Sequence, residues 1–482
     1  MKRLNGMDAM LLYSETPNLH THTLKVLVID AGKGEQAFNF DVFRRYLQDR
    51  LHDLTPLRYT LVNVPWRLHH PTWRVHDGVD LSYHLRRVQV AAPGGRRELD
   101  ELIGRIASTP LDRNRPLWEF HFVEGLADDR FALVGKVHHS LADGVASANL
   151  LSRLMGLVEG GQPSGVGDVA GMVPTTSQLL RQAGRDHIRQ ITALPRLLND
   201  AARGATRLRR RAKSRGRCPD LATMFNAPPT FLNHEVSPTR TFTTVSLPLR
   251  DVKQTAKSVG ATFTDVVMAV AAGGLRELLL RYDGRADRPL LATVPISTDG
   301  SSDRLDGNEI SGLTISLPVH IDSPLRRVSL ITAAATAAKE DHELLGPTLQ
   351  GRMMGYLPPP LAPAMFRRQA RRAANRVMNV AVSTVRGPSR QGTIAGAPVS
   401  EIYSVGVLSS GSAFNMTAWS YGDQVDIAVL SDDRTFNDPR EAAEAMAHAF
   451  AELQREAGLD GDAHVAGQRL RPPGQASGPS AI

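Results

Sequence analysis

The segment His138-His139-Ser140-Leu141-Ala142-Asp143-Gly144 decides how the rest of the chain is interpreted. It follows an apolar segment, residues 131–137, that is typical of a strand. It precedes residues 145–158, whose apolar side chains recur at helical spacing. Two histidines followed after three residues by Asp-Gly rarely occur together by chance. The pattern therefore predicts a strand, a short loop that carries a chemical site, and a helix.

The residue types of this loop suit proton transfer. A histidine has an ordinary pKa near 6.5, so at neutral pH it can accept a proton as a general base. Asp143 can fix the direction of the ring through an ion pair or backbone hydrogen bonds, or it can merely cap the following helix. Gly144 lets the backbone turn tightly or approach a ligand. The chain has no Gly-x-Ser-x-Gly motif, and Cys218 has no histidine nearby in sequence, so direct attack is favoured over a covalent enzyme intermediate.

The composition narrows the class of protein. The chain has 482 residues, 42% of them hydrophobic, which is enough for a large core and for about two to three domains. A single cysteine excludes a disulfide framework, a cysteine-based zinc site and an iron–sulfur cluster. Residues 1–39 lack the pattern of a secretory signal, and the longest apolar stretch, residues 266–280, is interpreted as a buried helix. We therefore expect a cytoplasmic protein without a membrane span.

The formal net charge of +8 is concentrated in two stretches. Residues 181–217 contain twelve basic residues and two aspartates, and residues 344–400 contain eight arginines and no acidic residue. Both stretches interleave arginine with apolar side chains, as does a helix that lies on an anionic lipid surface. A solvated basic face or flexible linker is an equally good interpretation. Nucleic-acid binding is disfavoured, because only 5% of residues are aromatic and no stacking platform is visible.

Strand and helix signals alternate along the chain and predict an α/β (α+β) fold, with mixed sheets covered by helices. The candidate strands are residues 24–29, 58–62, 118–123, 131–137, 240–247, 290–295, 310–321, 377–385, 401–407, 413–421 and 425–430. The candidate helices are residues 42–51, 98–108, 145–158, 249–258, 264–282, 325–345 and 439–456. The predicted units are an N-terminal domain (1–160), a Gly-rich loop and basic helical connection (161–235), a C-terminal domain (236–465) and a disordered tail (466–482).

The motif HHxxxDG is the signature of an acyltransferase superfamily with a chloramphenicol acetyltransferase-like fold. Further segments, in order along nearly the whole chain, resemble the bacterial wax ester synthase/acyl-CoA:diacylglycerol acyltransferase family. The most specific is Pro110-Leu111-Asp112-Arg113-Asn114-Arg115-Pro116-Leu117-Trp118, similar to PLDRxRPLW. The others are Met7-Asp8-Ala9-Met10-Leu11-Leu12, Thr264-Asp265-Val266-Val267-Met268-Ala269 (NDVVLA), Val294-Pro295-Ile296-Ser297 (VPVS), Gly307-Asn308 and Asn415-Met416-Thr417 (LNIT).

The resemblance implies two chloramphenicol acetyltransferase-like domains with the active site at their interface. There, long-chain acyl-CoA meets a hydroxyl acceptor, and no metal, cofactor or prosthetic group is required. His139 is implied to be the general base, with His138 and Asp143 orienting the site. The backbone amide of Gly144 is one candidate for the donor that faces the oxyanion. The positions implied to bind substrate are Thr264, Asp265, Asn308 and Asn415, and Thr264 and Asn308 are two further oxyanion candidates.

The expected reaction transfers a long-chain acyl group to diacylglycerol to give triacylglycerol, and also to fatty alcohols to give wax esters. Two alternatives stay open: an acyltransferase for another alcohol or amine acceptor, and a catalytically impaired lipid-surface protein. They are motivated by Thr264, where the family has asparagine, and by residues 298–303, which replace a short basic segment. We expect peripheral association with the inner membrane face or lipid droplets through residues 181–217 and 352–390, and no nucleic-acid partner.

Overall fold

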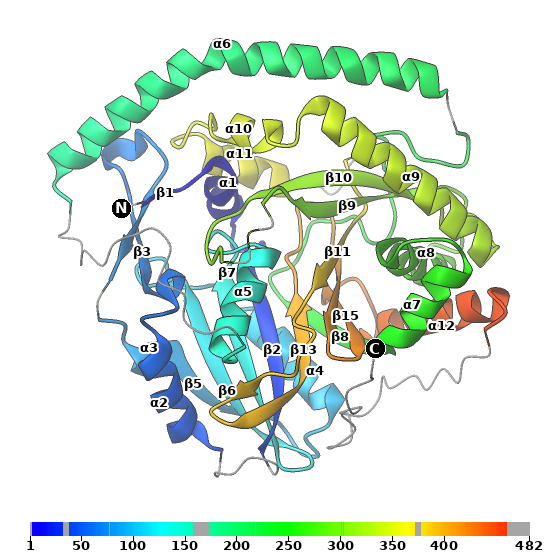
Figure 1. Ribbon diagram of the computed structural model, residues 1–482, viewed down its shortest axis with the longest axis horizontal. Coiled ribbons are helices and arrows are strands. Elements are labelled where there is room, and N and C mark those ends of the chain that lie inside the picture. Colours follow the sequence, from blue (N-terminus) through cyan, green and yellow to red (C-terminus); the bar gives the residue numbers. More distant parts are fainter. Residues whose placement is uncertain are drawn as a thin grey trace.

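The chain is built around two six-stranded sheets that lie side by side (Figure 1). The computed structural model describes residues 2–31, 38–76, 78–157, 174–216, 218–299, 301, 303–371 and 377–459. Most of the predicted Gly-rich loop and all of the predicted tail, residues 466–482, lie outside the described residues. The sheets and their helices confirm the predicted mixed α/β fold.

The first sheet has the order β12-β13-β2-β7-β6-β5. Its strands are β2 (His22–Asp30), β5 (Leu85–Gln89), β6 (Trp118–Leu126), β7 (Arg130–His138), β12 (Thr393–Ile394) and β13 (Ala397–Val405). Side chains alternate between its two faces, as a strand dictates. One face of β2 packs against α4 (Arg96–Ala107), and the other packs against α2 (Phe40–Arg50) and α5 (Gly144–Leu154).

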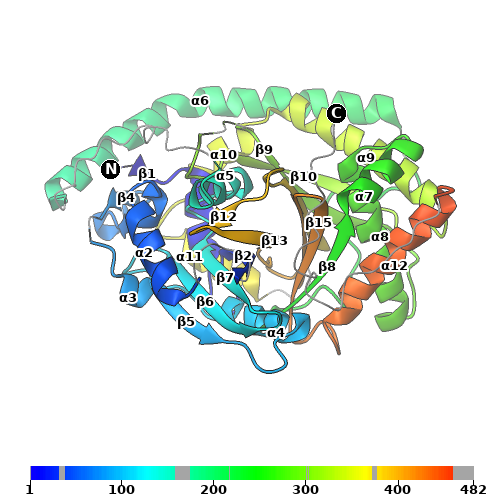
Figure 2. The same ribbon diagram turned by 60° about the horizontal axis from the view of Figure 1, so that its bottom comes forward.

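The two outermost strands on one side of this sheet come from the C-terminal half of the chain. Strand β13 pairs antiparallel with β2, and Ser404 lies opposite Lys25. The predicted C-terminal domain, 236–465, is therefore not a separate unit: residues 393–405 leave it and complete the first sheet (Figures 1 and 2). This crossing could not be predicted, because a strand pattern does not identify the sheet that the strand joins.

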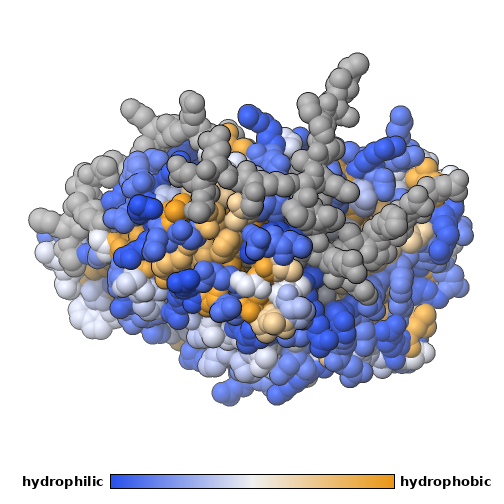
Figure 3. Space-filling view, turned by 90° about the horizontal axis from the view of Figure 1, so that it is seen from below, coloured by the Kyte–Doolittle hydropathy of each residue, from blue (hydrophilic) through white to orange (hydrophobic). Residues whose placement is uncertain are grey.

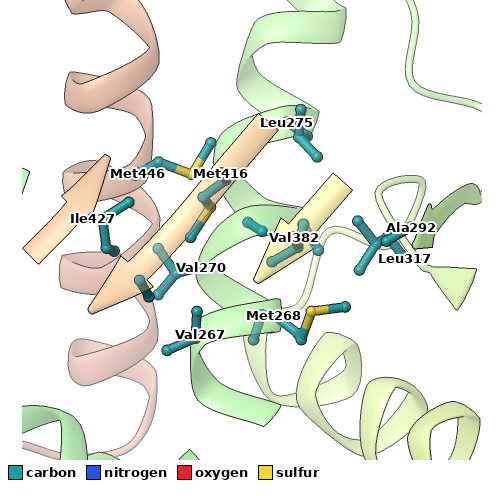
Figure 4. Close-up of a cluster of buried hydrophobic side chains, with 14 of the residues drawn as sticks. Val267, Met268, Val270, Leu275, Ala292, Leu317, Val382, Met416, Ile427 and Met446 are labelled. Atoms are coloured by element: carbon teal, nitrogen blue, oxygen red, sulfur yellow. The ribbon is translucent and has the colours of Figure 1, made fainter. Parts of the chain in front are cut away.

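The second sheet has the order β10-β9-β11-β14-β15-β8. Its strands are β8 (Arg240–Pro248), β9 (Leu290–Ser297), β10 (Ile310–Leu317), β11 (Val380–Arg386), β14 (Phe414–Tyr421) and β15 (Gln424–Asp432). Its helices are α7 (Leu249–Ser258), α8 (Phe263–Tyr282), α9 (Pro324–Leu345) and α12 (Arg440–Glu456). Figure 4 shows its core, where Val270 and Leu275 of α8 meet Val382 and Met416 of the sheet.

Helix α8 is the apolar stretch interpreted above as a buried helix. It begins with a capping box in which Thr262 accepts from Asp265 N and Asp265 accepts from Thr262 N. Its central residues, from Asp265 to Leu275, are all buried. Among the described helices none could cross a membrane alone by length and apolarity; α7 and α8 meet that criterion only as a pair bent by 97°.

A smaller region around the N-terminus supports the site described below. Strands β1 (Lys2–Arg3), β4 (Thr72–Val75) and β3 (Tyr59–Val62) form a three-stranded sheet. Helix α1 (Gly6–Ser14) starts at the cap Asn5 and packs against α10 (Leu349–Met354) and α11 (Ala362–Ala370). A Cβ atom at Gly6 would lie 2.2 Å from the backbone nitrogen of Gly355, so only glycine allows this approach.

The predicted basic helical connection contains one long helix, α6 (Thr176–Arg215), which runs along one side of the molecule (Figures 1 and 2). Part of its charge is paired, since Arg211 and Arg215 bind Glu340 and Asp341 of α9. Figure 3 views the opposite side, which is mostly hydrophilic with hydrophobic residues gathered in one area.

Candidate active site

The HHxxxDG loop joins the two halves of the fold. Strand β7 ends at His138, and α5 begins at Gly144. Between them the loop pairs with a segment that precedes β10, because Gly307 N donates to Leu141 O (2.7 Å) and Asp143 N donates to Gly307 O (3.2 Å). The loop that carries the histidines is thus held directly by a loop of the second sheet.

The ring of His139 is held by Asn308. His139 Nδ1 lies 2.9 Å from Asn308 Oδ1. Asn308 Nδ2 donates to Asp8 Oδ1 (2.8 Å) and to His139 O (2.7 Å), and both of these atoms can only accept. The amide orientation is therefore fixed with its oxygen toward His139. It follows that Nδ1 carries the ring proton and that Nε2 presents its lone pair.

The surroundings of His139 favour the neutral ring. Burial lowers its pKa below the ordinary value, and the charge of Lys25 lowers it further, while Asp143 and Asn308 act in the opposite direction. A lowered pKa keeps the imidazole unprotonated at neutral pH. Nε2 can then accept a proton from a bound hydroxyl group.

Asp8 stands behind Asn308 in the same chain of hydrogen bonds. Its Oδ1 also accepts from Asn308 N (2.9 Å), and its carboxyl is fully buried. Burial raises the pKa of Asp8 to about 7, although the hydrogen bonds from Asn308 and the charge of Lys2 lower it. Helix α1 therefore supplies the outer support of the His139 ring.

His138 faces a different environment from its neighbour. Its Nδ1 accepts from Ser140 N (3.1 Å), so Nε2 carries the proton and lies 2.9 Å from Thr21 Oγ1. Glu15 Oε2 is 3.8 Å from the same nitrogen and is bound by Arg113 of the PLDRxRPLW-like segment. The described contacts of His138 thus hold the end of β7 and do not touch the His139 ring.

Asp143 forms an ion pair and caps the following helix, and its described hydrogen bonds do not include the His139 ring. Its carboxylate receives two hydrogen bonds from Arg304 Nη2 (2.9 and 2.8 Å), and it caps α5 by accepting from Ala146 N (3.0 Å). It also accepts from Glu309 N (3.1 Å). Asp143 is 1% exposed, so this ion pair is a buried clamp between the loop and the segment after β9. The atom that contacts the His139 ring nitrogen belongs to Asn308, not to Asp143.

A cavity of about 290 Å³ opens beside His139. Gly144 at the start of α5 lines this cavity, and strands β11, β13 and β14 also contribute to its wall. The residues that line it include Thr23, Lys25, His139, Gly144, Ser147, Ser404, Gly406 and Thr417.

A second, narrower cavity of about 50 Å³ shares Thr23, Lys25 and Ser147 with the first. It lies between the first sheet and α5, and its remaining lining is apolar. These side chains are Leu27, Leu54, Leu57, Phe120, Leu133, Val137, Leu150, Leu151 and Leu154. We call this second cavity the apolar slot.

The structure separates the four positions predicted to bind substrate. Asn308 touches His139, as described. Asn415 lies behind the cavity wall, since its Oδ1 accepts from Thr417 Oγ1 (3.1 Å) and Thr417 lines the cavity. Thr264 and Asp265 stand in the first turn of α8, where Asp265 is used in the capping box, and neither lines the His139 cavity. Their contact with substrate remains a prediction.

Comparison with known proteins identifies the family. Residues 4–267 match the wax ester synthase/diacylglycerol acyltransferase catalytic domain, and residues 306–454 match the WS/DGAT C-terminal domain. The chain is 51% identical over 460 residues to a Mycobacterium tuberculosis protein named "Putative diacyglycerol O-acyltransferase", covering 95% of this chain and 97% of that protein. The chain belongs to the wax ester synthase/diacylglycerol acyltransferase family. It is an acyltransferase.

Solved structures agree with this family assignment. The wax ester synthase/diacylglycerol acyltransferase from Marinobacter aquaeolei VT8 superposes with a TM-score of 0.64 at 26% identity, covering 95% of this chain and 100% of that one. The first condensation domain of the calcium-dependent antibiotic synthetase superposes with a TM-score of 0.58 at 16% identity, covering 95% and 96% of the two chains. This second likeness shows the shared fold of the two families.

Three residues of the site were not singled out from the sequence. Asp8 lies within the recognised opening segment, but nothing there indicated that it reaches Asn308. Arg304 is a basic residue that directly follows the divergent residues 298–303. Lys25 is the clearest missed signal, because it interrupts the apolar strand of residues 24–29 with a charge. Within the described part of the chain, no three His, Cys, Asp or Glu side chains are grouped so that they could hold a metal ion.

Proposed function

We propose that the protein transfers a long-chain fatty acyl group from acyl-CoA to the hydroxyl of diacylglycerol, giving triacylglycerol, and to fatty alcohols, giving wax esters. The observation that carries the proposal is the His139 ring. Its Nδ1 is committed to Asn308, its Nε2 is available, and its cavity shares a wall with the apolar slot. Family membership supports acyl-CoA as the donor.

In the proposed mechanism His139 Nε2 takes the proton of the acceptor hydroxyl while that oxygen bonds to the thioester carbonyl carbon. The tetrahedral intermediate then collapses, the C–S bond breaks, and the CoA thiolate leaves with the proton from His139. A positioned base of this kind contributes about 10²–10⁴ to the rate. Asn308 keeps the ring in the basic tautomer throughout and supports the transient imidazolium by accepting from Nδ1.

The start of α5 is the proposed site of the oxyanion. Gly144 is the first residue of α5 and lines the cavity, and its N–H makes no intrahelical hydrogen bond at that position. The positive end of the helix dipole adds to the effect of these amide groups. A single oxyanion donor is typically worth about 10²–10³ in rate.

The apolar slot is the proposed place for an alkyl chain of one substrate. Each methylene group that leaves water for such a lining gains about 0.8 kcal/mol. Thr264 does not line the His139 cavity, so the exchange of the family's asparagine gives no reason, at this ring, to expect an impaired enzyme. Transfer to a different alcohol or an amine remains the second candidate.

The test offers radiolabelled palmitoyl-CoA to the purified full chain with diacylglycerol, with hexadecanol and without acceptor, and separates the lipids by thin-layer chromatography. We expect label in triacylglycerol and wax ester, and a loss of at least about a hundredfold in His139→Ala. A Lys253→Ala protein is the matched control, since Lys253 is an exposed residue of α7 that does not line the His139 cavity. Label that moves equally well in His139→Ala would contradict the mechanism, and no label with any acceptor would contradict the proposed reaction.

We further propose that α6 attaches the protein to an anionic membrane face or lipid-droplet surface. Ile188, Ile191 and Leu198 are 64%, 69% and 61% exposed and follow one stripe of the helix. Among the described residues, Arg196 and Arg203 of this helix form no ion pair and remain available for headgroups. Basic side chains near such a surface contribute about 1 kcal/mol each.

Liposome sedimentation tests this attachment. We expect binding to vesicles with anionic lipid, weaker binding at high salt, and less binding when Ile188, Ile191 and Leu198 are all changed to serine. If the amount of protein that sediments with the vesicles depends on neither the salt concentration nor the anionic lipid, the proposal is contradicted.

A further inference from the structure

Lys25 is a buried ammonium group without an ionic partner at the site. It is 8% exposed, and Nζ makes a single described hydrogen bond, which it donates to Ser404 Oγ (2.8 Å). The ring of Trp419 lies 5.4 Å from Nζ, and no ion pair of Lys25 occurs among the described residues. An ammonium group has three N–H donors, so two of them have no acceptor among the residues that the structure describes.

The sheet directs this ammonium group into the cavities. Lys25 stands between Ser404 of β13 and Gly135 of β7 in the strand register. Gly135 has no side chain, and a Cβ atom there would lie 2.9 Å from the Phe120 ring. The missing side chain lets the Phe120 ring lie over Gly135, and both residues line the apolar slot. Lys25 lines this slot and the His139 cavity.

From the His139 cavity into the apolar slot, the groups therefore follow in the order base (His139), cation (Lys25) and apolar lining. A glycerolipid acceptor has the same order: its hydroxyl is followed within a few bonds by ester carbonyl oxygens and then by an alkyl chain. A simple fatty alcohol and the acyl chain of the donor instead bring methylene groups to the position of Lys25. A buried cation whose remaining N–H donors meet only methylene groups is costly, so the alkyl chains fit this position poorly.

We propose that Lys25 is a specificity-determining residue that selects acyl acceptors with a carbonyl oxygen a few bonds from the reacting hydroxyl. The proposal rests on the proposed acyl transfer to an alcohol. Two sources of that oxygen share the chemistry, the ester of a diacylglycerol and the carboxylate of a hydroxy fatty acid. Nζ donates to either, with Ser404 holding the ammonium in place.

The experiment measures kcat/KM at saturating palmitoyl-CoA for 1,2-dioctanoylglycerol, 3-hydroxyhexadecanoate and hexadecanol. In Lys25→Met we expect kcat/KM to fall about tenfold for the diacylglycerol and more for the hydroxy acid, and to stay level or rise for hexadecanol. Lys25→Gln keeps an N–H donor without the charge. It should therefore restore kcat/KM for the diacylglycerol, which carries an ester, better than kcat/KM for the hydroxy acid, which carries a carboxylate.

Thr23→Val is the matched control. Thr23 lies on the same strand and lines the same two cavities, but it carries no charge. We expect this variant to keep the ratio of the three acceptors within about twofold. Because removal of an unpaired buried charge relieves a desolvation cost, Lys25→Met should melt no lower than the wild type.

A pH series supplies a readout that a purely structural role would not move. Burial lowers the pKa of Lys25 to about 8, with Asp143 raising it. The titratable groups that face it are Asp143, which is held by Arg304, and His139, whose pKa burial lowers below the ordinary histidine value. Ser404, Gly135, Ser147 and Trp419, from the four elements packed around it, do not titrate. The preference of the wild type for the hydroxy acid should therefore decline above about pH 8, and Lys25→Met should show no such decline.

A binding measurement distinguishes failure of this proposal from failure of the proposed reaction. Intrinsic tryptophan fluorescence, to which Trp419 beside Lys25 contributes, reports the Kd of the diacylglycerol and of hexadecanol without turnover. It is measured in the His139→Ala background with and without Lys25→Met. If the wild type transfers no label but the Lys25-dependent preference in Kd persists, the reaction is wrong and the selection by Lys25 stands. Equal losses for all acceptors, or unchanged ratios in both kcat/KM and Kd, would overturn the role of Lys25.

Discussion

The two six-stranded sheets use their buried space differently. The core between the second sheet and helices α8, α9 and α12 is a continuous set of Val, Ala, Leu, Ile, Met and Phe side chains (Figure 4). The second sheet also buries charges, which lie on β8 and β15: Arg240, Asp426 and Asp432. The first sheet differs in burying a charge at the cavity that is unpaired among the described residues, Lys25, besides the pairs Lys136–Glu119 (2.9 Å) and Arg96–Glu401. Buried charge is costly even when paired, whereas apolar packing is the main stabilising contribution.

This difference shows which part of the molecule mainly provides stability and which part mainly carries the reacting groups. The second sheet and its helices form a large apolar core. The loop between its strands β9 and β10, which carries Arg304 and Asn308, contacts the HHxxxDG loop. The first sheet carries the histidines, and the buried polar groups on its faces lower the stability of the fold. Substitutions in the two regions should therefore affect different measurements, and the following four predictions test this.

The largest effect is expected on stability, from Leu275→Ala in α8. Leu275 is fully buried in the apolar core, so its truncation should lower the free energy of unfolding by about 2–5 kcal/mol. Chemical denaturation measures this loss, and kcat/KM per folded molecule should stay unchanged. A comparable loss of activity in the folded protein would show that the second sheet takes part in the chemistry.

The next effect is expected on activity, from Asn308→Ala. Without Asn308 Oδ1 the ring proton of His139 is no longer held on Nδ1, and the basic lone pair can move away from the cavity. We expect kcat/KM to fall about a hundredfold. Steady-state kinetics with melting curves check this, and a fall in melting temperature without a fall in kcat/KM would contradict it.

A smaller loss is expected from Asp8→Ala. This variant leaves two N–H groups of Asn308 without their buried acceptor, each at a cost of about 1–3 kcal/mol, and should lower kcat/KM about tenfold. Asp8→Asn keeps an oxygen in the same place and is the matched control, with activity close to the wild type. Equal activities of the two variants would argue against the chain of hydrogen bonds from α1.

The smallest effect is a shift of the pH profile. The acid limb of kcat/KM should lie below the ordinary histidine pKa, because burial and Lys25 lower the pKa of His139. Lys25→Met removes a cation that opposes protonation, so the pKa of His139 should rise and the limb should move to higher pH. A limb that does not move, or moves to lower pH, would show that Lys25 does not act on the ring.

Much of the fold followed from local patterns. The periodicity of residues 249–258 predicted α7 with the bounds that the structure has, and the predicted strand 131–137 matches β7 within a residue at each end. The helix predicted to end at residue 158 ends at Leu154, and the strand predicted at 401–407 starts at Ala397. Boundaries are decided by tertiary contacts such as the pairing of β13 with β2, which a local pattern does not contain.

The candidate site was predicted only in its central loop. The motif drew attention to His138, His139 and Asp143 because their spacing is rare, and Asn308 followed from the resemblance. Asp8 and Arg304 could not be predicted, since each reaches the site across about 130 residues or more of chain through the fold. Thr264 and Asp265 were expected at the substrate, but the start of α8 uses Asp265 as a helix cap.

The most direct test of the account compares the two adjacent histidines. The rate of CoA release from palmitoyl-CoA in the presence of diacylglycerol, together with the melting temperature, is measured for His139→Ala and His138→Ala. His139→Ala should lose about 10²–10⁴ of the rate and keep the wild-type melting temperature, since its ring faces the cavity. His138→Ala should melt earlier, because it opens a hole at the buried end of β7, and should keep most of the rate per folded molecule. If His139→Ala retains the wild-type rate, or if the two variants exchange these properties, the assignment of His139 as the base is wrong.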